Sequence, residues 1–237
     1  MTGSLRAFVR PAPRQQINFN TARSLVEPEA FQGSRAWIVG GSRGLGEVAA
    51  KLLAAGGAAV TITYHRGADD AERVASEIRE GGGIVQIRTL NVLDPSDTFA
   101  TLIDEEDNPT GILYFATPFI TPGEEGRFSS ELFNGYCKYY VHGFTRLVHI
   151  FAPYGLTRVL FPSSVYVDDP PAQFAEYAAA KAAGEIACLA LEKAYRDLEI
   201  SRPRLPRLAT DQTASLSQLK ALDPAPLILA TLKSWGV

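Results

Sequence analysis

The sequence predicts a single α/β domain, in which a doubly wound parallel sheet of about six to seven strands carries helices on both faces. Short apolar runs alternate along the chain with longer segments whose apolar residues recur at helical spacing. Strands separated by helices pair in parallel through right-handed crossovers. The apolar runs contain few polar residues, which is typical of strands buried on both faces of a sheet.

The first half of the predicted domain opens with Ala36–Gly40 (AWIVG), an apolar run closed by a glycine, followed by a helix over Leu45–Ala55. The next strand is predicted over Ala58–Tyr64, because this β-branched run follows two glycines. Charged and apolar residues recur at helical spacing over Asp69–Arg79, and three consecutive glycines end that helix. A strand over Ile84–Leu90 follows them.

The second half repeats the alternation. A helix is predicted near Asp97–Asp104, and the apolar run Gly111–Ala116 (GILYFA) predicts a buried strand. A long helix over Ser129–Phe151, a strand over Thr157–Phe161 and a second long helix over Phe174–Leu198 come next.

The C-terminal part is expected to add a strand over Ile200–Leu208 and a final helix that ends at Trp235. Asp223 is a suitable N-cap for that helix, and Pro224 suits its first turn.

Residues 1–34 differ from the rest of the chain, since they contain prolines at positions 11, 13 and 28 and show weak periodicity. We expect an N-terminal arm or linker, with a turn or short helix around Ala22–Phe31, outside an α/β domain of residues 35–237. The sequence leaves open whether this segment packs over the domain or leads away from it.

Length and composition are those of an ordinary globular protein. The 237 residues are 46% hydrophobic and 21% charged, and a chain of this length buries roughly 70% of its unfolded surface without needing disulfides or metals. A formal net charge of −3 argues against a nucleic-acid partner. No apolar run approaches the ~20 residues of a membrane span, and no signal peptide is visible. We therefore expect no membrane association and a cytoplasmic location.

Cysteine and histidine are sparse and unpatterned. Cys137 and Cys188 lie far apart, so we expect two buried thiols in a reducing compartment. His65, His142 and His149 have no metal-ligand spacing, so no metal site is expected.

A glycine-rich turn joins the first predicted strand to the first predicted helix. Gly40, Gly44 and Gly46 permit a tight turn and close approach of the backbone to a pyrophosphate at the helix N-terminus. Ser42, Arg43 and Leu45 belong to the same turn. Its position between a strand and a helix favours a dinucleotide site over a turn without a ligand.

Cations stand where the adenosine ribose of such a dinucleotide is expected. His65 and Arg66 follow Tyr64 at the end of the second predicted strand, and no carboxylate occurs between this strand end and Asp69. Arg43 adds a second guanidinium, and this group matches phosphate oxygens in a fork. The pattern favours NADP(H) over NAD, with ordinary surface charge as the alternative.

Three polar residues near the end of the fifth predicted strand form a catalytic pattern. Ser164 follows that strand, and Tyr177 lies thirteen residues later. Lys181 is four residues beyond the tyrosine, so both point to one face of a helix. An ammonium one turn away is expected to draw the tyrosine pKa downward, which would suit acid–base catalysis.

These motifs together resemble the short-chain dehydrogenase/reductase superfamily, whose members have Rossmann-type domains, over roughly residues 35–213. The resemblance implies that Tyr177 exchanges the proton at a substrate carbonyl and that Ser164 hydrogen-bonds the same oxygen. It also implies that Lys181 holds the ribose hydroxyls and lowers the tyrosine pKa. By the same resemblance, Asn91 and Val92 contact the adenine.

Two stretches depart from the family pattern. The family's Asn-Asn-Ala-Gly motif reads Tyr114–Thr117 here, and only its alanine, Ala116, is retained. The resemblance implies that Ala116 contacts the cofactor. The asparagine that the family carries on the long helix is replaced by Tyr140, and Asn134 lies one to two turns earlier.

The C-terminal part also departs from the family. Its Pro-Gly pair reads Pro206-Arg207, with Thr210 or Thr213 as the equivalent of the threonine at the carboxamide. The short end resembles ketoreductase domains of polyketide and fatty-acid synthesis, although most of those have asparagine where Lys181 stands. Three arginines within residues 202–207 fit either an acidic acyl carrier or a solvated strand edge.

The leading hypothesis is an NADP(H)-dependent reductase that converts a ketone into an alcohol, with a carrier- or CoA-bound 3-oxoacyl group as one substrate class. The competing hypothesis is a non-catalytic dinucleotide-binding sensor or a structural partner domain of a larger assembly. An epimerase or dehydratase that uses the same tyrosine is a third. A homodimer through the two long helices is plausible from the resemblance, and the short end predicts an open cleft completed by the arm, the final helix or a partner.

Overall fold

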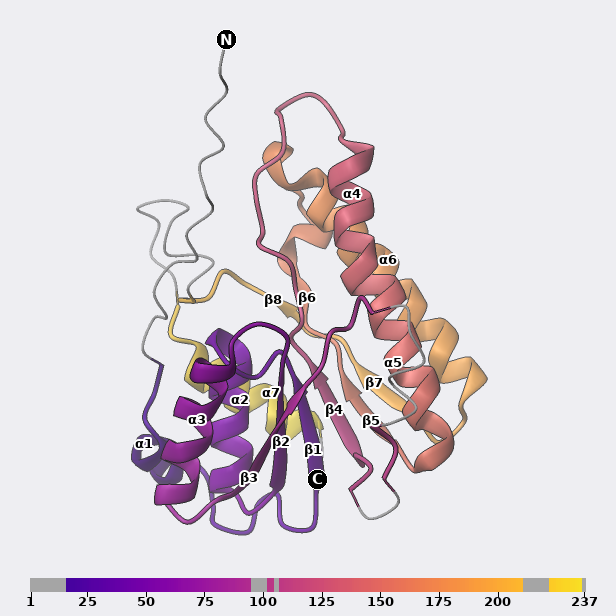
Figure 1. Cartoon of the computed structure of the whole chain (residues 1–237). Coiled ribbons are helices and arrows are strands. Elements are labelled where there is room, and N and C mark those ends of the chain that lie inside the picture. Colours follow the sequence, from indigo (N-terminus) through magenta and orange to yellow (C-terminus); the bar gives the residue numbers. More distant parts are fainter. Residues whose placement is uncertain (1–15, 95–101, 105–106, 211–221, 236–237) are drawn as a thin grey trace.

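The computed structural model describes residues 16–94, 102–104, 107–210 and 222–235 (Figure 1). A six-stranded sheet in the order β3-β2-β1-β4-β5-β7, parallel throughout, forms its centre. Its strands are β1 (Arg35–Val39), β2 (Ala59–Tyr64), β3 (Ile84–Thr89), β4 (Gly111–Tyr114), β5 (Arg158–Leu160) and β7 (Glu199–Ser201). The predicted fold class is confirmed.

Helices cover both faces of this sheet, and Figure 1 shows α1, α2, α3 and α7 on one side of it and α4, α5 and α6 on the other. They are α1 (Phe19–Leu25), α2 (Gly44–Ala55), α3 (Ala68–Glu80), α4 (Ser130–Cys137), α5 (Phe144–Phe151), α6 (Ala175–Ala194) and α7 (Pro224–Trp235). Most predicted elements therefore form within a few residues of their expected bounds. The helix predicted near Asp97–Asp104 lies mainly outside the described residues.

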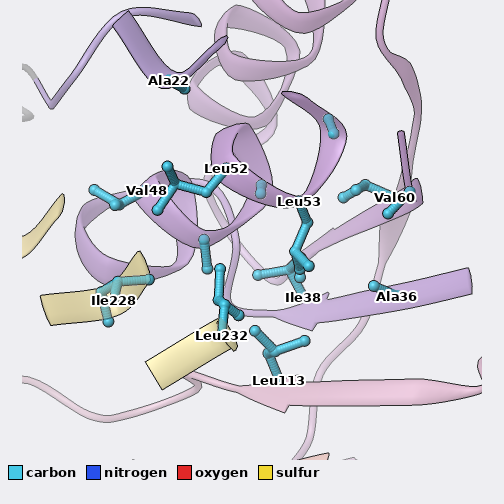
Figure 2. Packing of buried hydrophobic residues seen from close by; sticks show 14 of the residues in the cluster. Ala22, Ala36, Ile38, Val48, Leu52, Leu53, Val60, Leu113, Ile228 and Leu232 are labelled. Carbon is cyan, nitrogen blue, oxygen red and sulfur yellow. The ribbon is translucent and has the colours of Figure 1, made fainter. Parts of the chain in front are cut away.

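Alternation along the central strands divides the interior into two hydrophobic cores. Ile38 of β1 packs into the core under α2 and α7, which Figure 2 shows, whereas its neighbour Trp37 packs into the core under α4–α6. The two residues point to opposite faces because side chains alternate along a strand. β1 is buried on both faces, as its continuous apolar sequence predicts.

The N-terminal segment 16–34 is part of the first core. Phe19 and Phe31 are buried, and the Phe19 ring lies against Gly81, where a Cβ would have no room. The backbone of the segment is also fixed by ionised side chains. Lys51 Nζ donates to the Ile17 carbonyl over 2.9 Å, and the Phe19 N–H donates to Glu77 Oε1 over 2.6 Å. These residues pack over the domain, and their helix begins three residues before the predicted position.

The predicted strand Ile200–Leu208 is wrong as one element. β7 ends at Ser201, and the separate strand β8 (Arg204–Leu205) pairs with β6 (Ser163–Ser164) in a small second sheet. Pro203 interrupts the run, because proline has no N–H to donate to a sheet. The pairing of β8 with β6 places Leu205 next to Ser164.

The predicted helix over Ser129–Phe151 is continuous but contains a wide turn. Between α4 and α5 the chain forms the π-helical turn η2 (Lys138–Gly143). The Tyr114 hydroxyl donates a 2.8 Å hydrogen bond to the Tyr139 carbonyl within this turn. No proline explains the irregularity, and π turns of this kind are frequent at functional sites.

Candidate functional site

A cavity of about 620 Å³ opens at the carboxyl ends of the parallel strands. Its position is the one at which open α/β sheets bind ligands. Residues from the ends of β1, β2, β3 and β4 line one part of it, and β6 and α6 line another. All the candidate site residues lie on its wall: Gly40, Ser42, Arg43, Gly44, Leu45, Gly46, His65, Arg66, Asn91, Val92, Ala116, Ser164, Tyr177 and Lys181.

The glycine turn leaves no space for side chains at two positions. Gly40 has φ 81°, and a Cβ on it would lie 3.0 Å from the Ala116 nitrogen. A Cβ on Gly46 would lie 2.8 Å from the Gly41 Cα and closer still to the Gly40 carbonyl oxygen. The turn leads directly into α2, whose first-turn N–H groups have no capping side chain from Arg43. This backbone cradle fits a pyrophosphate at the helix N-terminus.

Of the two arginines predicted to face the added phosphate, Arg43 and Arg66, the first forms an ion pair with a carboxylate. Arg43 Nε forms a 2.5 Å ion pair with Asp70 Oδ2 from α3, and both side chains are largely buried. The sequence gives no signal for this pair, because Asp70 lies 27 residues after Arg43 and belongs to a different predicted element. Arg66 and His65 are exposed at the end of β2 and line the same part of the cavity. Arg66 is therefore the better placed of the two arginines to meet an added phosphate.

Ser164 and Tyr177 meet across the cavity wall. Ser164 stands at the end of β6 and Tyr177 in the first turn of α6, both side chains line the cavity, and the Ser164 hydroxyl is near enough to act on the pKa of Tyr177. Burial raises the pKa of Tyr177 to about 12, and the Ser164 hydroxyl opposes that rise. The expected lowering of the Tyr177 pKa is wrong for this structure, because desolvation of the phenol dominates and the Lys181 ammonium is bound elsewhere.

Lys181 is buried and turned toward a carbonyl group and two rings. Its Nζ donates to the Pro162 carbonyl over 2.6 Å. The same atom lies 3.9 Å from the centre of the Tyr140 ring and 4.9 Å from that of Phe161. Burial lowers the pKa of Lys181 to about 7, and the negative charge of Glu185 opposes that effect.

Tyr140 occupies the helix position where the family resemblance implies an asparagine. It comes from the π turn and is buried, and its hydroxyl shares a 2.5 Å hydrogen bond with Thr117 Oγ1. Asn134 is exposed on α4 and is not among the residues that line the cavity. Of these two residues, Tyr140 and not Asn134 therefore lies beside the reacting groups.

Beyond Tyr177 the cavity wall is apolar. This end carries no ionisable group other than tyrosine among the lining residues Pro118, Phe119, Ile120, Val165, Tyr166 and Phe174. None of these positions belongs to a recognisable motif, so the sequence offered no signal for them. The loop that contributes Phe119 is tied to α6, because the buried Glu176 accepts a 2.6 Å hydrogen bond from the Ser129 N–H.

The expected completion of the cleft by the arm or the final helix is not seen within the described chain. No described residue of segment 16–34 or of α7 lines the cavity. Instead, Ile228 and Leu232 of α7 pack into the core beside α2, as Figure 2 shows. Both α1 and α7 pack against α2, the helix that follows the glycine turn.

The remaining sequence expectations concern metals, thiols and membranes. Cys137 and Cys188 are buried free thiols, as expected. Within the described ranges, no group of three or more His, Cys, Asp or Glu side chains could hold a metal ion. None of the described helices is both long and apolar enough to cross a membrane.

Comparison with known proteins yields a family match over most of the chain. The family model described as short chain dehydrogenase matches residues 34–218. An uncharacterized oxidoreductase of Escherichia coli K12, YgfF, is 34% identical over 80 residues. That alignment covers 33% of this chain and 32% of the relative, so the chain matches about a third of the relative's length.

Solved structures share the fold. An Escherichia coli oxidoreductase, yciK, has a TM-score of 0.76 at 20% identity over 89% of this chain and 92% of its own. A short chain dehydrogenase of Escherichia coli CFT073, complexed with NADPH, has a TM-score of 0.77 at 19% identity over 89% and 94%. A 3-oxoacyl (acyl-carrier-protein) reductase of Agrobacterium tumefaciens C58, with NADP bound, has a TM-score of 0.75 at 17% identity over 86% and 88%.

Proposed function

The chain belongs to the short chain dehydrogenase family, a family of oxidoreductases, and from that premise we propose that it is an NADP(H)-dependent reductase that converts a ketone into an alcohol. The observation that carries the proposal is the meeting of Ser164, Tyr177 and Lys181 in the cavity that the glycine turn also lines. A proton donor and a dinucleotide cradle thus share one site.

Tyr177 is suited to give a proton. Because its pKa is about 12, the phenol is protonated at neutral pH and can donate to a carbonyl oxygen as that oxygen becomes an alcohol. Ser164 lines the same cavity beside the phenol and would hold the same oxygen. When bound, NADPH supplies the hydride that the carbonyl carbon accepts.

The cradle residues fit the parts of NADP(H). The narrow turn at Gly40 and Gly46 would hold the pyrophosphate, since a Cβ would fill the space at either position. Arg66 and His65, with Arg43, would meet the 2′-phosphate. Other residues line the same cavity. Of these, Asn91 and Val92 would contact the adenine, Ala116 would lie on the nicotinamide side, and Lys181 would hold the ribose.

The apolar end of the cavity favours a ketone with an uncharged, hydrophobic substituent, since its lining offers no partner for a charged group. A carrier- or CoA-bound 3-oxoacyl group also has an apolar chain next to its ketone. The arginines considered for carrier docking support that substrate less, because Arg202 is paired with Glu192 and Arg204 with Glu185.

One observation favours the competing non-catalytic sensor: a buried tyrosine, Tyr140, stands where the family resemblance implies asparagine. Two measurements separate the functions. NADPH and NADH are titrated by fluorescence, and NADPH oxidation is then followed with a panel of apolar ketones and acetoacetyl-CoA. We expect tight NADPH binding and turnover of at least one ketone. Binding without turnover across the panel would favour the sensor, and absence of binding would contradict both functions.

A further inference from the structure

The Lys181 ammonium has an unusual environment for a buried cation. Lys181 is only 7% exposed, and the one hydrogen bond described for Nζ is to the Pro162 carbonyl. On its other sides the ammonium faces the Tyr140 and Phe161 rings, at 3.9 and 4.9 Å from their centres. Burying an ammonium is unfavourable unless other groups compensate the lost hydration. An aromatic face within about 6 Å compensates part of it through the negative potential above the ring.

We propose that Tyr140 is a positioning residue whose ring face holds the Lys181 ammonium by a cation–π contact and thereby sets the place of that cation beside Tyr177. The inference rests on the proposed reductase function for its catalytic consequence. The contact itself depends only on the geometry of three side chains and can be tested separately.

The Tyr140 ring is itself fixed from several directions, as a positioning group requires. Its hydroxyl is bound to Thr117 over 2.5 Å. Its ring stacks on Tyr136 at 6.0 Å with an interplanar angle of 5°. Tyr136 is in turn bound to the loop between β4 and α4, because its hydroxyl donates to the Thr121 carbonyl over 3.0 Å.

The same ring contacts the proton donor. Tyr177 meets Tyr140 edge to face, with ring centres 5.9 Å apart and planes at 81°. Tyr140 thus touches both Lys181 and Tyr177, which lie one turn apart on α6. The π turn is the local cause, because it brings Tyr140 to the cavity wall and fixes the adjacent Tyr139 carbonyl on the Tyr114 hydroxyl.

The test alters the ring's electrostatics while keeping its shape. Tyr140→Phe retains the ring face but loses the Thr117 bond, and Tyr140→pentafluorophenylalanine reverses the sign of the potential above a ring of nearly equal size. We expect Tyr140→Phe to keep kcat within about threefold of the unaltered enzyme, and the fluorinated ring to lower kcat about tenfold or more. The ketone KM should change little in both. Pentafluorophenylalanine in place of Phe133, which lies on α4 against Phe128, is the matched control and should leave kcat unchanged.

A second measurement does not require turnover. In protein containing lysine labelled with ¹³C at Cε, we expect the Lys181 methylene protons to resonate upfield, because the adjoining Nζ lies 3.9 Å from the centre of the Tyr140 ring. Lys181→Met assigns the signal. We expect the upfield shift to persist in Tyr140→Phe and to be lost in Tyr140→Leu.

The outcomes distinguish this inference from the proposed function. A folded protein that reduces no ketone contradicts the reductase, while the Lys181 resonance still reports on the contact. An active enzyme whose kcat is the same with Phe and with pentafluorophenylalanine at position 140 overturns the positioning role. So does an unchanged Lys181 resonance in Tyr140→Leu.

Discussion

The Tyr114 hydroxyl lies 2.8 Å from the Tyr139 carbonyl oxygen and joins the end of β4 to the π turn η2. Tyr114 is fully enclosed, and burial raises the pKa of its phenol well above the ordinary value. The phenol therefore stays protonated and acts as a permanent donor. The bond couples the strand that lines the cofactor part of the cavity to the helix turn that carries Tyr140.

Replacing Tyr114 by Phe removes this donor and leaves the Tyr139 carbonyl without it. The carbonyl still accepts from the Phe144 N–H, so the variant loses one hydrogen bond without leaving the acceptor unpaired, and we expect the free energy of unfolding to fall by about 0.5–1.5 kcal/mol. Urea denaturation measures it. Tyr154→Phe is the control, because Tyr154 is 48% exposed and should change the stability by less than about 0.5 kcal/mol. Equal stability of both variants would show that the bond contributes nothing.

Tyr177→Phe removes the proposed proton donor while keeping the ring packed against Tyr136 and Tyr140. General acid catalysis contributes roughly 10²- to 10⁴-fold, and we expect kcat to fall within that range. NADPH affinity, measured by fluorescence titration, should stay near that of the unaltered protein. Tyr195→Phe alters a tyrosine bonded to His149, away from the cavity lining, and should retain full activity. Full activity in Tyr177→Phe would contradict the role of Tyr177 as proton donor.

Arg66→Ala tests the preference for NADP(H). A charge-assisted hydrogen bond contributes about 1.5–3 kcal/mol, so loss of this guanidinium should weaken NADPH binding roughly 10- to 100-fold. NADH binding should change little, since NADH has no 2′-phosphate. Arg79→Ala removes an exposed arginine paired with Glu72 on α3 and serves as the charge-matched control. Equal weakening of NADPH and NADH would place the phosphate contact elsewhere.

Gly46→Ala tests the cradle. The added Cβ would lie 2.8 Å from the Gly41 Cα, so the turn must open, and we expect NADPH binding to be lost together with part of the stability. Gly135→Ala is the control, because nothing lies within 4 Å of a Cβ at that helical glycine. That variant should be as stable as the original or more stable. A Gly46→Ala protein with normal NADPH affinity contradicts the proposed role of the turn.

Lys181 should make stability depend on pH. Its pKa is about 7 in the folded protein and has its usual value of 10.5 when unfolded. Between these values the unfolded chain binds more protons than the folded one, so stability rises with pH from about 7 to about 10.5. Below pH 7 both states are protonated, and the penalty of burying the charge is constant. In Lys181→Met this contribution disappears. The stability difference between variant and original, measured by urea unfolding at several pH values, should therefore become less favourable to the variant as pH rises. A difference independent of pH would contradict the lowered pKa.

Much of the fold could be predicted from the sequence because local signals and tertiary structure agree. The glycines that precede β2 and β3 mark where α2 and α3 end, and the apolar run of β1 is long enough to show burial on both faces. The break between β7 and β8 coincides with Pro203, which has no N–H to donate to a sheet.

The site could be predicted as a set of residues but not as a set of contacts. The spacing of Tyr177 and Lys181 places them on one helical face, yet it contains no information on what buries them. Desolvation decided both pKa values, and it comes from residues such as Tyr140 and Phe161 that approach from other elements. The Asp70 partner of Arg43 is likewise 27 residues away in the chain.

The π turn η2 also affects how this protein is aligned with its relatives. An α-helix advances about 100° per residue, so an extra residue in one turn rotates every later side chain by about that angle relative to an unbroken helix. A relative with an ordinary helix here would be matched by a one-residue gap inside the helix, and not in a flanking loop. If the alignment lacks that gap, α4 and α5 cannot both be matched with the equivalent residues of the relative. Position 140 would then be compared with a residue on a different face of the relative's helix.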